Sequence, residues 1–253
     1  MKAKPYRIVC HSADKARWLY ERQESIGASD KLTPSLIRDK LGESEPFLGN
    51  RKMRMGSILE RAAIDGFQTW SGLRTRPSGV MVRSKQYPFM HATLDGLCMT
   101  PKKSKGLQYF LETEMQMGSE RVASILADRR LAVLEVKVPD IFSLHRWGHV
   151  RLEHKKVGDD MLSYHVFVRL KDEPPKMYMT QVQHQLAVTG FEAAWLVALI
   201  GGKTFVAHYI VRNEAMITER IRRCAEMWSH IEKAREQQEI EDQATFEEIM
   251  QMQ

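Results

Sequence analysis

Hydrophobic and polar residues repeat with two different periods along the chain, and these periods predict helices and strands. Apolar residues recur at helical spacing from Ile58 to Trp70 and again from Ile217 to Ile231, behind a capping Asn213, which predicts two long helices. Further helices are expected over 12–22, near Pro34 and over 177–188. Short apolar runs predict strands at 80–83, 89–94, 131–138, 164–170, 193–200 and 204–211, the last two joined by a hairpin at Gly201-Gly202-Lys203. We therefore expect an α/β fold with helix-rich ends around a small mixed sheet.

Three segments interrupt this pattern. Pro77 to Gly79 predicts a turn before the strand at 80–83, and Thr100 to Gly106 predicts a basic turn. From there to Arg130 the residues follow no period, so we interpret 100–130 as a hairpin or a mobile excursion. The polar stretch 232–253 predicts a helical tail that frays or serves in assembly. We expect one domain over 1–253, with a core from about residue 12 to residue 231.

Composition narrows the class of protein. Of the 253 residues, 43% are hydrophobic, which is enough for a core. The 38 Lys and Arg against 32 Asp and Glu give a net charge of +6, which suits a polyanionic partner without proving one. The three cysteines have no metal-binding spacing, so we expect a reduced, intracellular protein without a zinc ribbon or iron–sulfur cluster. The most apolar segment, 193–200, is too short to cross a bilayer, so no membrane association is expected.

The strand expected at 131–139 carries one acid and one lysine, Glu135 and Lys137. Because side chains alternate along a strand, these two share one face, and Leu134, Val136 and Val138 share the other. Two interpretations fit this pattern: an ordinary half-solvated strand, or a catalytic pair held against a buried sheet.

Two further acids are candidates for the same site. Glu60 lies on a partly apolar helix face, either as an edge residue or aimed at a metal ion, and Asp95 ends a strand before Gly96, either as turn chemistry or as a rigid metal ligand. Phosphodiester hydrolysis needs a neutralised transition state and an activated water, which a divalent metal ion on carboxylates supplies. Lys137 is then expected to position or deprotonate that water, with its pKa lowered by the metal charge and by burial.

Other polar residues have two interpretations each. Arg22 and Ser29 flank the small residues Gly27 and Ala28, where an anion can approach the backbone; alternatively, Ser29 or Asp30 caps the helix near Pro34 and Arg22 is a solvated charge. In the basic patch at 145–156, His145 and His149 have the i, i+4 spacing of a metal site but no third ligand, so we expect a solvated or DNA-facing surface. Gln181 and Gln185 share one helix face, as solvated surface or as amides that orient water and phosphate oxygens.

The order of these motifs resembles a known family. Gly56-x-x-x-Glu60, Asp95-Gly96-Leu97, Leu134 to Pro139 and Gln181-Val182-Gln183 are together similar to the YqaJ-type viral recombinase and lambda exonuclease family, within the PD-(D/E)xK nuclease superfamily. The similarity extends from about Trp18 to about Val211. It implies a restriction-endonuclease-like core, a mixed β-sheet flanked by helices.

The resemblance also assigns roles to residues. It implies Mg²⁺ ligands at Asp95, Glu135 and the Val136 carbonyl, with Mn²⁺ able to substitute. Glu60 is implied as a further site acid, Lys137 as the water-activating lysine, and Gln181 as a residue that orders the site. A pocket for the 5′-phosphate of the cut strand is implied at Arg22 and Ser29, and Thr93 stands where the family has a third pocket hydroxyl.

The activity implied is a Mg²⁺-dependent 5′-to-3′ exonuclease on double-stranded DNA ends, leaving 3′ overhangs for a single-strand annealing protein in phage-type recombination. A ring of three identical subunits and a cytoplasmic location in a bacterial host are implied with it. The excursion at 100–130 and the long insert before Gln181 are departures from the family pattern. Two rival hypotheses remain: a structure- or site-specific endonuclease of the same superfamily, and a catalytically idle DNA-binding protein on this scaffold.

Overall fold

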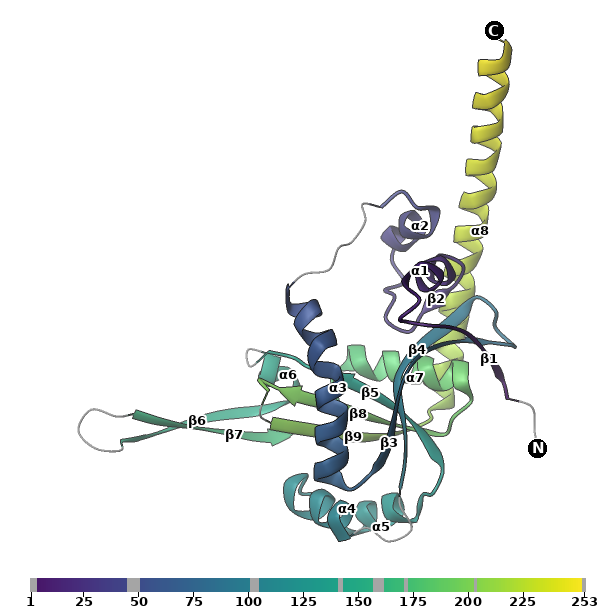
Figure 1. The fold of residues 1–253 in the computed structure, drawn as a ribbon. Coiled ribbons are helices and arrows are strands. Elements are labelled where there is room, and N and C mark those ends of the chain that lie inside the picture. The colour runs from purple at the N-terminus through teal and green to yellow at the C-terminus, as the bar shows by residue number, and fades with distance from the viewer. Residues whose placement is uncertain are drawn as a thin grey trace.

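A computed structural model describes residues 4–44, 51–100, 105–140, 143–156, 162–170, 173–202 and 204–251. It places one mixed sheet at the centre of the molecule, in the strand order β1-β3-β4-β5-β8-β9, with β2 pairing with β4 (Figure 1). The strands are β1 (Tyr6–His11), β2 (Ile26–Gly27), β3 (Arg74–Ser84), β4 (Met90–Met99), β5 (Leu131–Lys137), β8 (Ala193–Ile200) and β9 (Thr204–Val211).

The central strands have the expected types and near-expected bounds. β4 and β5 are antiparallel, whereas β5 and β8 are parallel, with Glu135 beside Leu196. Parallel neighbours need a crossover, and α7 (Lys176–Thr189) lies within the one that joins them. All eight residues of β8 are buried, as expected for a strand covered on both faces.

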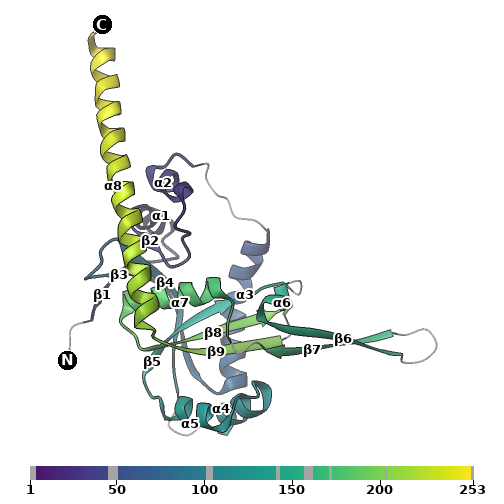
Figure 2. The same cartoon turned by 180° about the vertical axis from the view of Figure 1, so that it is seen from behind.

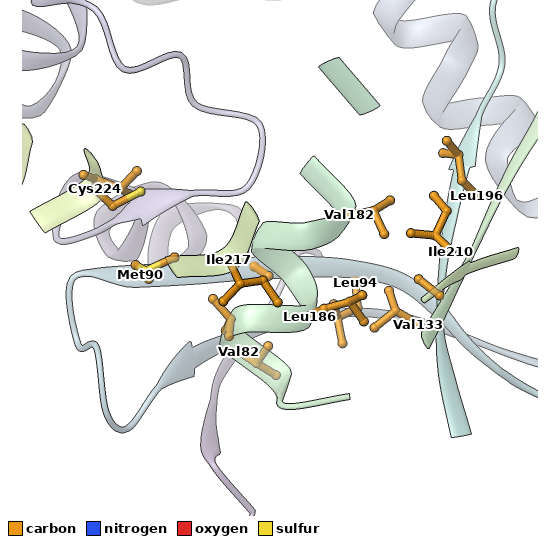
Figure 3. Packing of buried hydrophobic residues seen from close by; sticks show 14 of the residues in the cluster. Val82, Met90, Leu94, Val133, Val182, Leu186, Leu196, Ile210, Ile217 and Cys224 are labelled. Atoms are coloured by element: carbon orange, nitrogen blue, oxygen red, sulfur yellow. The ribbon is translucent and has the colours of Figure 1, made fainter. Parts of the chain in front are cut away.

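One hydrophobic core lies between the sheet and the helices α7, α2 (Pro34–Leu41) and α8 (Glu214–Gln251). Figure 3 shows Leu186 of α7 next to Leu94 and Val133 of the sheet. The apolar stripe expected from Ile217 to Ile231 packs into this core. α8 continues as a helix to Gln251, so the tail expected at 232–253 is helical over its described residues. Figure 2 shows α8 running past α1 (Lys15–Gln23) and α2 and beyond the rest of the molecule.

The second core lies on the opposite face of the sheet, and it overturns the interpretation of 100–130. Its residues come from α3 (Arg51–Ser71), α4 (Lys105–Tyr109), the π-helix η1 (Phe110–Glu114) and α5 (Ser119–Ala127). The central strands add the residues that point to this face of the sheet. Leu107, Phe110 and Leu111 are fully buried there. The segment is therefore a helical layer, neither a hairpin nor a mobile excursion. Residues 101–104, where most of the basic turn was expected, lie outside the described residues.

A two-stranded arm, β6 (Gly148–Lys156) and β7 (Leu162–Leu170), follows the short helix α6 (Leu144–Trp147) and projects from one side of the molecule (Figure 1). β7 confirms the strand expected at 164–170. Only the backbone of the arm is described, so most of the basic patch at 145–156 lies outside the described side chains. No helix in the described part of the chain is long and apolar enough to cross a membrane.

Three smaller expectations were wrong. The Pro77–Gly79 segment lies inside β3 as a bulge, since the pairing with β4 shifts between Pro77 and Val80. α1 begins at Lys15, because the Asp14 side chain accepts the Arg17 amide. Neither Ser29 nor Asp30 caps α2: Thr33 occupies the N-cap position, and its side chain makes no capping hydrogen bond.

Candidate active site

The Glu135 carboxylate lies at the centre of a polar cluster on β5. Its side chain is 2% exposed, and Lys137 forms an ion pair with its Oε1. Gln181 Nε2 donates to the same oxygen at 2.6 Å, and Gln185 Nε2 donates to Oε2. The shared face expected for Glu135 and Lys137 is confirmed, since Leu134 and Val136 pack into the second core on the other side. Glu135 is therefore an oriented buried charge and not part of a solvated surface.

Asp95 reaches the same cluster from the neighbouring strand. Its Oδ2 accepts the Val136 amide at 2.8 Å, so the carboxylate lies against the backbone of β5 between Glu135 and Lys137. Gly96, the next residue, packs against Leu134: an added Cβ would lie 3.1 Å from Arg76 O and 3.3 Å from Leu134 Cδ2. The Asp95-Gly96 pair thus allows β4 and β5 to approach closely enough for the two acids to share one site.

Glu60 approaches from α3 and is half-buried. Burial, followed by the charge of Glu135, raises its pKa above the usual range for a glutamate. The same two causes raise the pKa of Asp95 well above its usual range. Three carboxylates therefore influence one another electrostatically, which is the situation that a bound cation relieves.

The residues fit a divalent metal ion that keeps part of its water shell. Among the described residues, no three His, Cys, Asp or Glu side chains are arranged to enclose a metal ion by themselves. Mg²⁺ is typically bound through one or two carboxylates with several waters, and Asp95 and Glu135 offer that number. Gln185 Oε1 is buried and finds no hydrogen-bond partner among the described residues, which suits an ordered water near Glu135.

Lys137 remains charged in this arrangement. Burial lowers its pKa, but Glu135 and Asp95 outweigh burial, and the net effect is a pKa above the ordinary lysine value. The lowered pKa expected from the sequence therefore depends on a cation that neutralises these two carboxylates.

A cavity of ≈ 220 Å³ joins this cluster to the expected phosphate pocket. Its walls come from α1, the loop after β2, β4, β5 and α7, and include Arg22, Ser29, Thr93, Asp95, Glu135, Lys137 and Gln181. The structure thus brings together all the candidate side chains except Glu60, which contributes through its charge.

Trp18 forms one wall of the cavity. Its Nε1 donates to Thr93 Oγ1 at 3.1 Å, and the cations of Lys15 and Arg22 lie 3.9 and 4.8 Å from the centre of its ring. These contacts hold Arg22 at the mouth of the cavity by a cation–π interaction.

Buried charged side chains fix the loop that carries Ser29. Asp30 Oδ2 accepts the Gly27 amide at 2.9 Å, and Asp30 Oδ1 pairs with Arg22 at 3.2 Å. Lys40, whose side chain is 5% exposed, pairs with Asp30 Oδ2 at 3.1 Å and donates to Ser25 O at 2.8 Å. Burial opposes the Asp30 charge, yet Lys40 and Arg22 outweigh it and hold the Asp30 pKa well below its usual range.

A second buried cation holds the same loop from α8. Arg220 donates to Asp30 O at 3.1 Å and to Gly27 O at 3.4 Å, and its Nε donates to His184 Nδ1 at 3.1 Å. The loop is therefore fixed from α2 and from α8, residues that are distant in sequence.

Several of these residues were not predicted as site residues. His91 also lines the cavity, and a signal for it was present, because His91, Thr93 and Asp95 alternate along β4 and so share one strand face. Gln185 was paired with Gln181 on one helix face, but nothing in the sequence separated solvated amides from amides bound to Glu135. Trp18, Lys40 and Arg220 carry no local motif.

Comparisons with known proteins agree with this architecture. A family model, the YqaJ-like viral recombinase domain, matches residues 17–192. The "Uncharacterized protein YqaJ" of Bacillus subtilis (strain 168) is 24% identical over 244 residues, covering 90% of this chain and 60% of that protein. This chain thus matches somewhat more than half the length of that relative.

Solved structures share the fold. The alkaline exonuclease LHK-Exo from Laribacter hongkongensis superposes with a TM-score of 0.59 at 16% identity, covering 90% of this chain and 98% of that one. The complex of LHK-Exo with dAMP gives the same TM-score and coverage at 17% identity. The fold class expected from the sequence, a restriction-endonuclease-like mixed sheet flanked by helices, is confirmed. Since the family model covers well over half of the sequence, the chain belongs to the YqaJ-like viral recombinase domain family.

Proposed function

We propose that this protein is a Mg²⁺-dependent exonuclease that digests one strand of double-stranded DNA from its 5′ end. The observation that carries the proposal is the single cavity that joins Arg22, Ser29 and Thr93 to Asp95, Glu135 and Lys137. A phosphate-binding group and a hydrolytic group in one small cavity suit an enzyme that cuts next to a terminal phosphate. The fold shared with LHK-Exo, an alkaline exonuclease, supports the same class of reaction.

Each of these six residues has a chemical task in this proposal. Arg22, half-exposed at the mouth, binds the terminal 5′-phosphate as a charge-assisted donor, and the hydroxyls of Ser29 and Thr93 add neutral donors. The Trp18 ring keeps the Arg22 guanidinium in place. A hydroxyl end offers these donors no charged acceptor, so it lacks the charge-assisted hydrogen bonds that a phosphate makes. The cavity therefore favours phosphorylated ends.

The acid cluster holds the scissile phosphate and the water. Asp95, Glu135 and the Val136 carbonyl would hold Mg²⁺, which supplies charge neutralisation at the phosphate and a more acidic water. Gln181 and Gln185 orient the Glu135 carboxylate from α7. Lys137 Nζ lies beside Glu135 and is the group that accepts or positions the proton of the attacking water. Glu60 adds negative charge that favours retention of the cation.

The lysine separates this proposal from an idle DNA-binding protein. Lys137→Ala should reduce cleavage by several orders of magnitude while DNA binding persists, since the basic groups at the cavity mouth are unchanged. Lys137→Arg is the matched control for charge, because arginine keeps the positive charge but does not give up a proton at working pH. Undiminished cleavage by Lys137→Ala would refute the role assigned to this residue.

The wider setting is proposed with the activity. It comprises 3′ overhangs passed to a single-strand annealing protein, a ring of three subunits, Mn²⁺ as a substitute metal, and action in the cytoplasm of a bacterial host. The first test of this setting is the molar mass in solution, for which a ring predicts about three times the chain mass of 29.3 kDa. A monomer that digests long DNA would argue against the ring.

A further inference from the structure

His91 lies at a position that the proposed mechanism does not use. It precedes Thr93 by two residues on β4, lines the same cavity, and is 3% exposed. A Cβ added to Gly27 would lie 2.8 Å from His91 Nε2, so the imidazole ring packs directly against the backbone of the loop that carries Ser29. A glycine at position 27 is therefore needed to bring this ring and the loop together.

The hydrogen bonds around His91 determine which of its nitrogens carries the proton. Ser25 Oγ donates its one hydrogen to Glu21 O at 3.0 Å, because a carbonyl can only accept. The 2.9 Å contact between Ser25 Oγ and His91 Nδ1 therefore has Nδ1–H as its donor. In the neutral ring, Nε2 then carries a lone pair, and no hydrogen bond to Nε2 is found among the described residues.

Charged groups surround this ring, and cations predominate. Those that act on it are Arg22 of α1, Asp30 of the following loop, Lys40 of α2, and Arg83 of β3, which itself pairs with Glu21. His184 and Arg220 lie behind the β4 backbone. Burial first, with Lys40, Arg22 and Arg83 adding to it against Asp30, lowers the pKa of His91 to about 3. The ring is neutral at physiological pH in the free protein.

His91 Nε2, a neutral acceptor, and the oxygens of a phosphate dianion cannot form a hydrogen bond with each other unless one proton lies between them. A terminal phosphate has a second pKa of about 6. Above that pH its terminal oxygens carry no proton and can only accept hydrogen bonds. Two lone pairs that face each other repel, whereas one added proton turns the contact into an N–H···O or an O–H···N hydrogen bond. Whether the proton lies on His91 Nε2 or on the phosphate oxygen, the surrounding cations keep the total charge of the pocket positive.

We propose that His91 is a further residue of the 5′-phosphate pocket and that its Nε2 shares one proton with a phosphate oxygen, so that binding a phosphorylated end takes up a proton. This inference rests on the proposed recognition of 5′-phosphate. The proton comes from solvent, no covalent bond of the DNA changes, and the proton is released when the end leaves. The pocket then distinguishes phosphorylated from hydroxyl ends more strongly at lower pH.

Isothermal titration calorimetry tests the proton directly. Duplexes that differ in the 5′-phosphate alone are titrated at pH 7.5 into the full-length Lys137→Ala protein with Mg²⁺, in two buffers of different ionisation enthalpy. Phosphorylated ends should take up about one more proton than hydroxyl ends, and their affinity should fall up to about tenfold per pH unit above neutrality. Equal proton uptake by the two duplexes would overturn the proposal, and this test leaves His91 unchanged.

Substitution at His91 separates this role from a structural one. In His91→Gln the amide supplies a donor that does not titrate, so the preference for phosphorylated ends should persist while the extra proton and the pH dependence disappear. His230→Gln, an exposed change on α8, should leave both unchanged. An extra proton that survives His91→Gln assigns it to another group and refutes the proposal.

Failure of the proposed function gives a different result. If phosphorylated and hydroxyl ends bind equally at every pH, there is no 5′-phosphate pocket and both proposals fall. If phosphorylated ends bind more tightly but take up no extra proton, the pocket stands and the role of His91 is wrong.

Discussion

Asp95 and Val136 are joined by a 2.8 Å hydrogen bond from the Val136 amide to Asp95 Oδ2. This bond fixes a side chain of β4 on the backbone of β5, at the same residue whose carbonyl is the third proposed metal ligand. The two carboxylates and this carbonyl therefore belong to one rigid unit of the sheet. Pre-organisation of this kind removes the need to order the site when a metal ion and DNA bind.

Gln185→Leu should weaken Mg²⁺ binding. The substitution removes the donor to Glu135 Oε2, and loss of a group that orients a metal ligand typically costs about 10–100-fold in metal affinity or activity. The measurement is the Mg²⁺ concentration that gives half-maximal cleavage.

Gln183→Leu is the matched control on the same helix. Gln183 Nε2 donates to Val211 O and its Oε1 accepts the Asn213 amide, each at 2.9 Å, and among the described residues it makes no hydrogen bond with Glu135. It should lower the free energy of unfolding and leave the Mg²⁺ requirement unchanged. A Mg²⁺ requirement that responds equally to both substitutions would contradict the role given to Gln185.

Arg22→Ala should abolish the preference for phosphorylated ends. The residue lines the cavity and its side chain is 37% exposed, and a charge-assisted hydrogen bond contributes about 1.5–3 kcal/mol. The expected result is a loss of about 10–100-fold on phosphorylated duplexes and little change on hydroxyl ends. Arg17→Ala, an exposed change on the same helix, serves as the control. A preference that persists in Arg22→Ala would place the phosphate elsewhere.

Phe110→Ala tests the helical layer at 105–127. Phe110 is fully buried against Phe67 and Trp70, and truncating such a residue typically costs about 3–5 kcal/mol of unfolding free energy. Its neighbour Tyr109 is 60% exposed, so Tyr109→Ala should cost far less. Urea unfolding of both variants decides the point, and equal small losses would favour a mobile excursion after all.

This layer also shows where sequence reasoning failed. The segment forms two short helices joined by a π-helix, and none is long enough to display a helical period. The buried residues Leu107, Phe110 and Leu111 stand at i, i+3 and i+4, but this spacing covers little more than one turn before the π-helix changes the pitch. By contrast, the helix from Ile58 to Trp70 and the strand with Glu135 and Lys137 were predicted correctly, because each repeats one period over several residues. The acid and lysine candidates therefore came from local patterns.

The residues that hold the phosphate loop could not be found in that way. Lys40 and Arg220 lie ten and 190 positions from Asp30 and meet it only in the folded chain. A lysine on a short amphipathic helix and an arginine on a charged one are typical of solvated surface. Their burial follows from the path of α2 and α8 against the loop, a tertiary effect that no single stretch of sequence carries.

Stability should fall as the pH is lowered from about 7 to 5. His184 donates from Nε2 to His91 O and accepts Arg220 at Nδ1, so both nitrogens are engaged in the neutral ring. Burial and Arg220 hold its pKa well below the ordinary 6.5. The unfolded chain therefore binds a proton below pH 6.5 that the folded chain does not bind, and the unfolding free energy decreases with falling pH.

The expected slope is up to about 1.4 kcal/mol per pH unit for each such histidine. His91 is held neutral in the same way, whereas the raised pKa values of Asp95 and Glu60 act on the slope in the opposite direction, so His184→Gln should lower the slope by the contribution of one histidine. Urea unfolding between pH 5 and 7 measures it. A slope that the substitution does not change would show that other groups cause the acid sensitivity.

The cleavage of DNA with and without ends tests the central claim most directly. The protein is incubated with Mg²⁺ and equal amounts of a linear duplex with 5′-phosphates, the same duplex with 5′-hydroxyls, and a closed circle of the same sequence. The proposed exonuclease degrades the phosphorylated linear duplex fastest, the hydroxyl duplex more slowly, and leaves the circle intact. Cleavage of the closed circle at the rate of the phosphorylated linear duplex would contradict the account and favour an endonuclease.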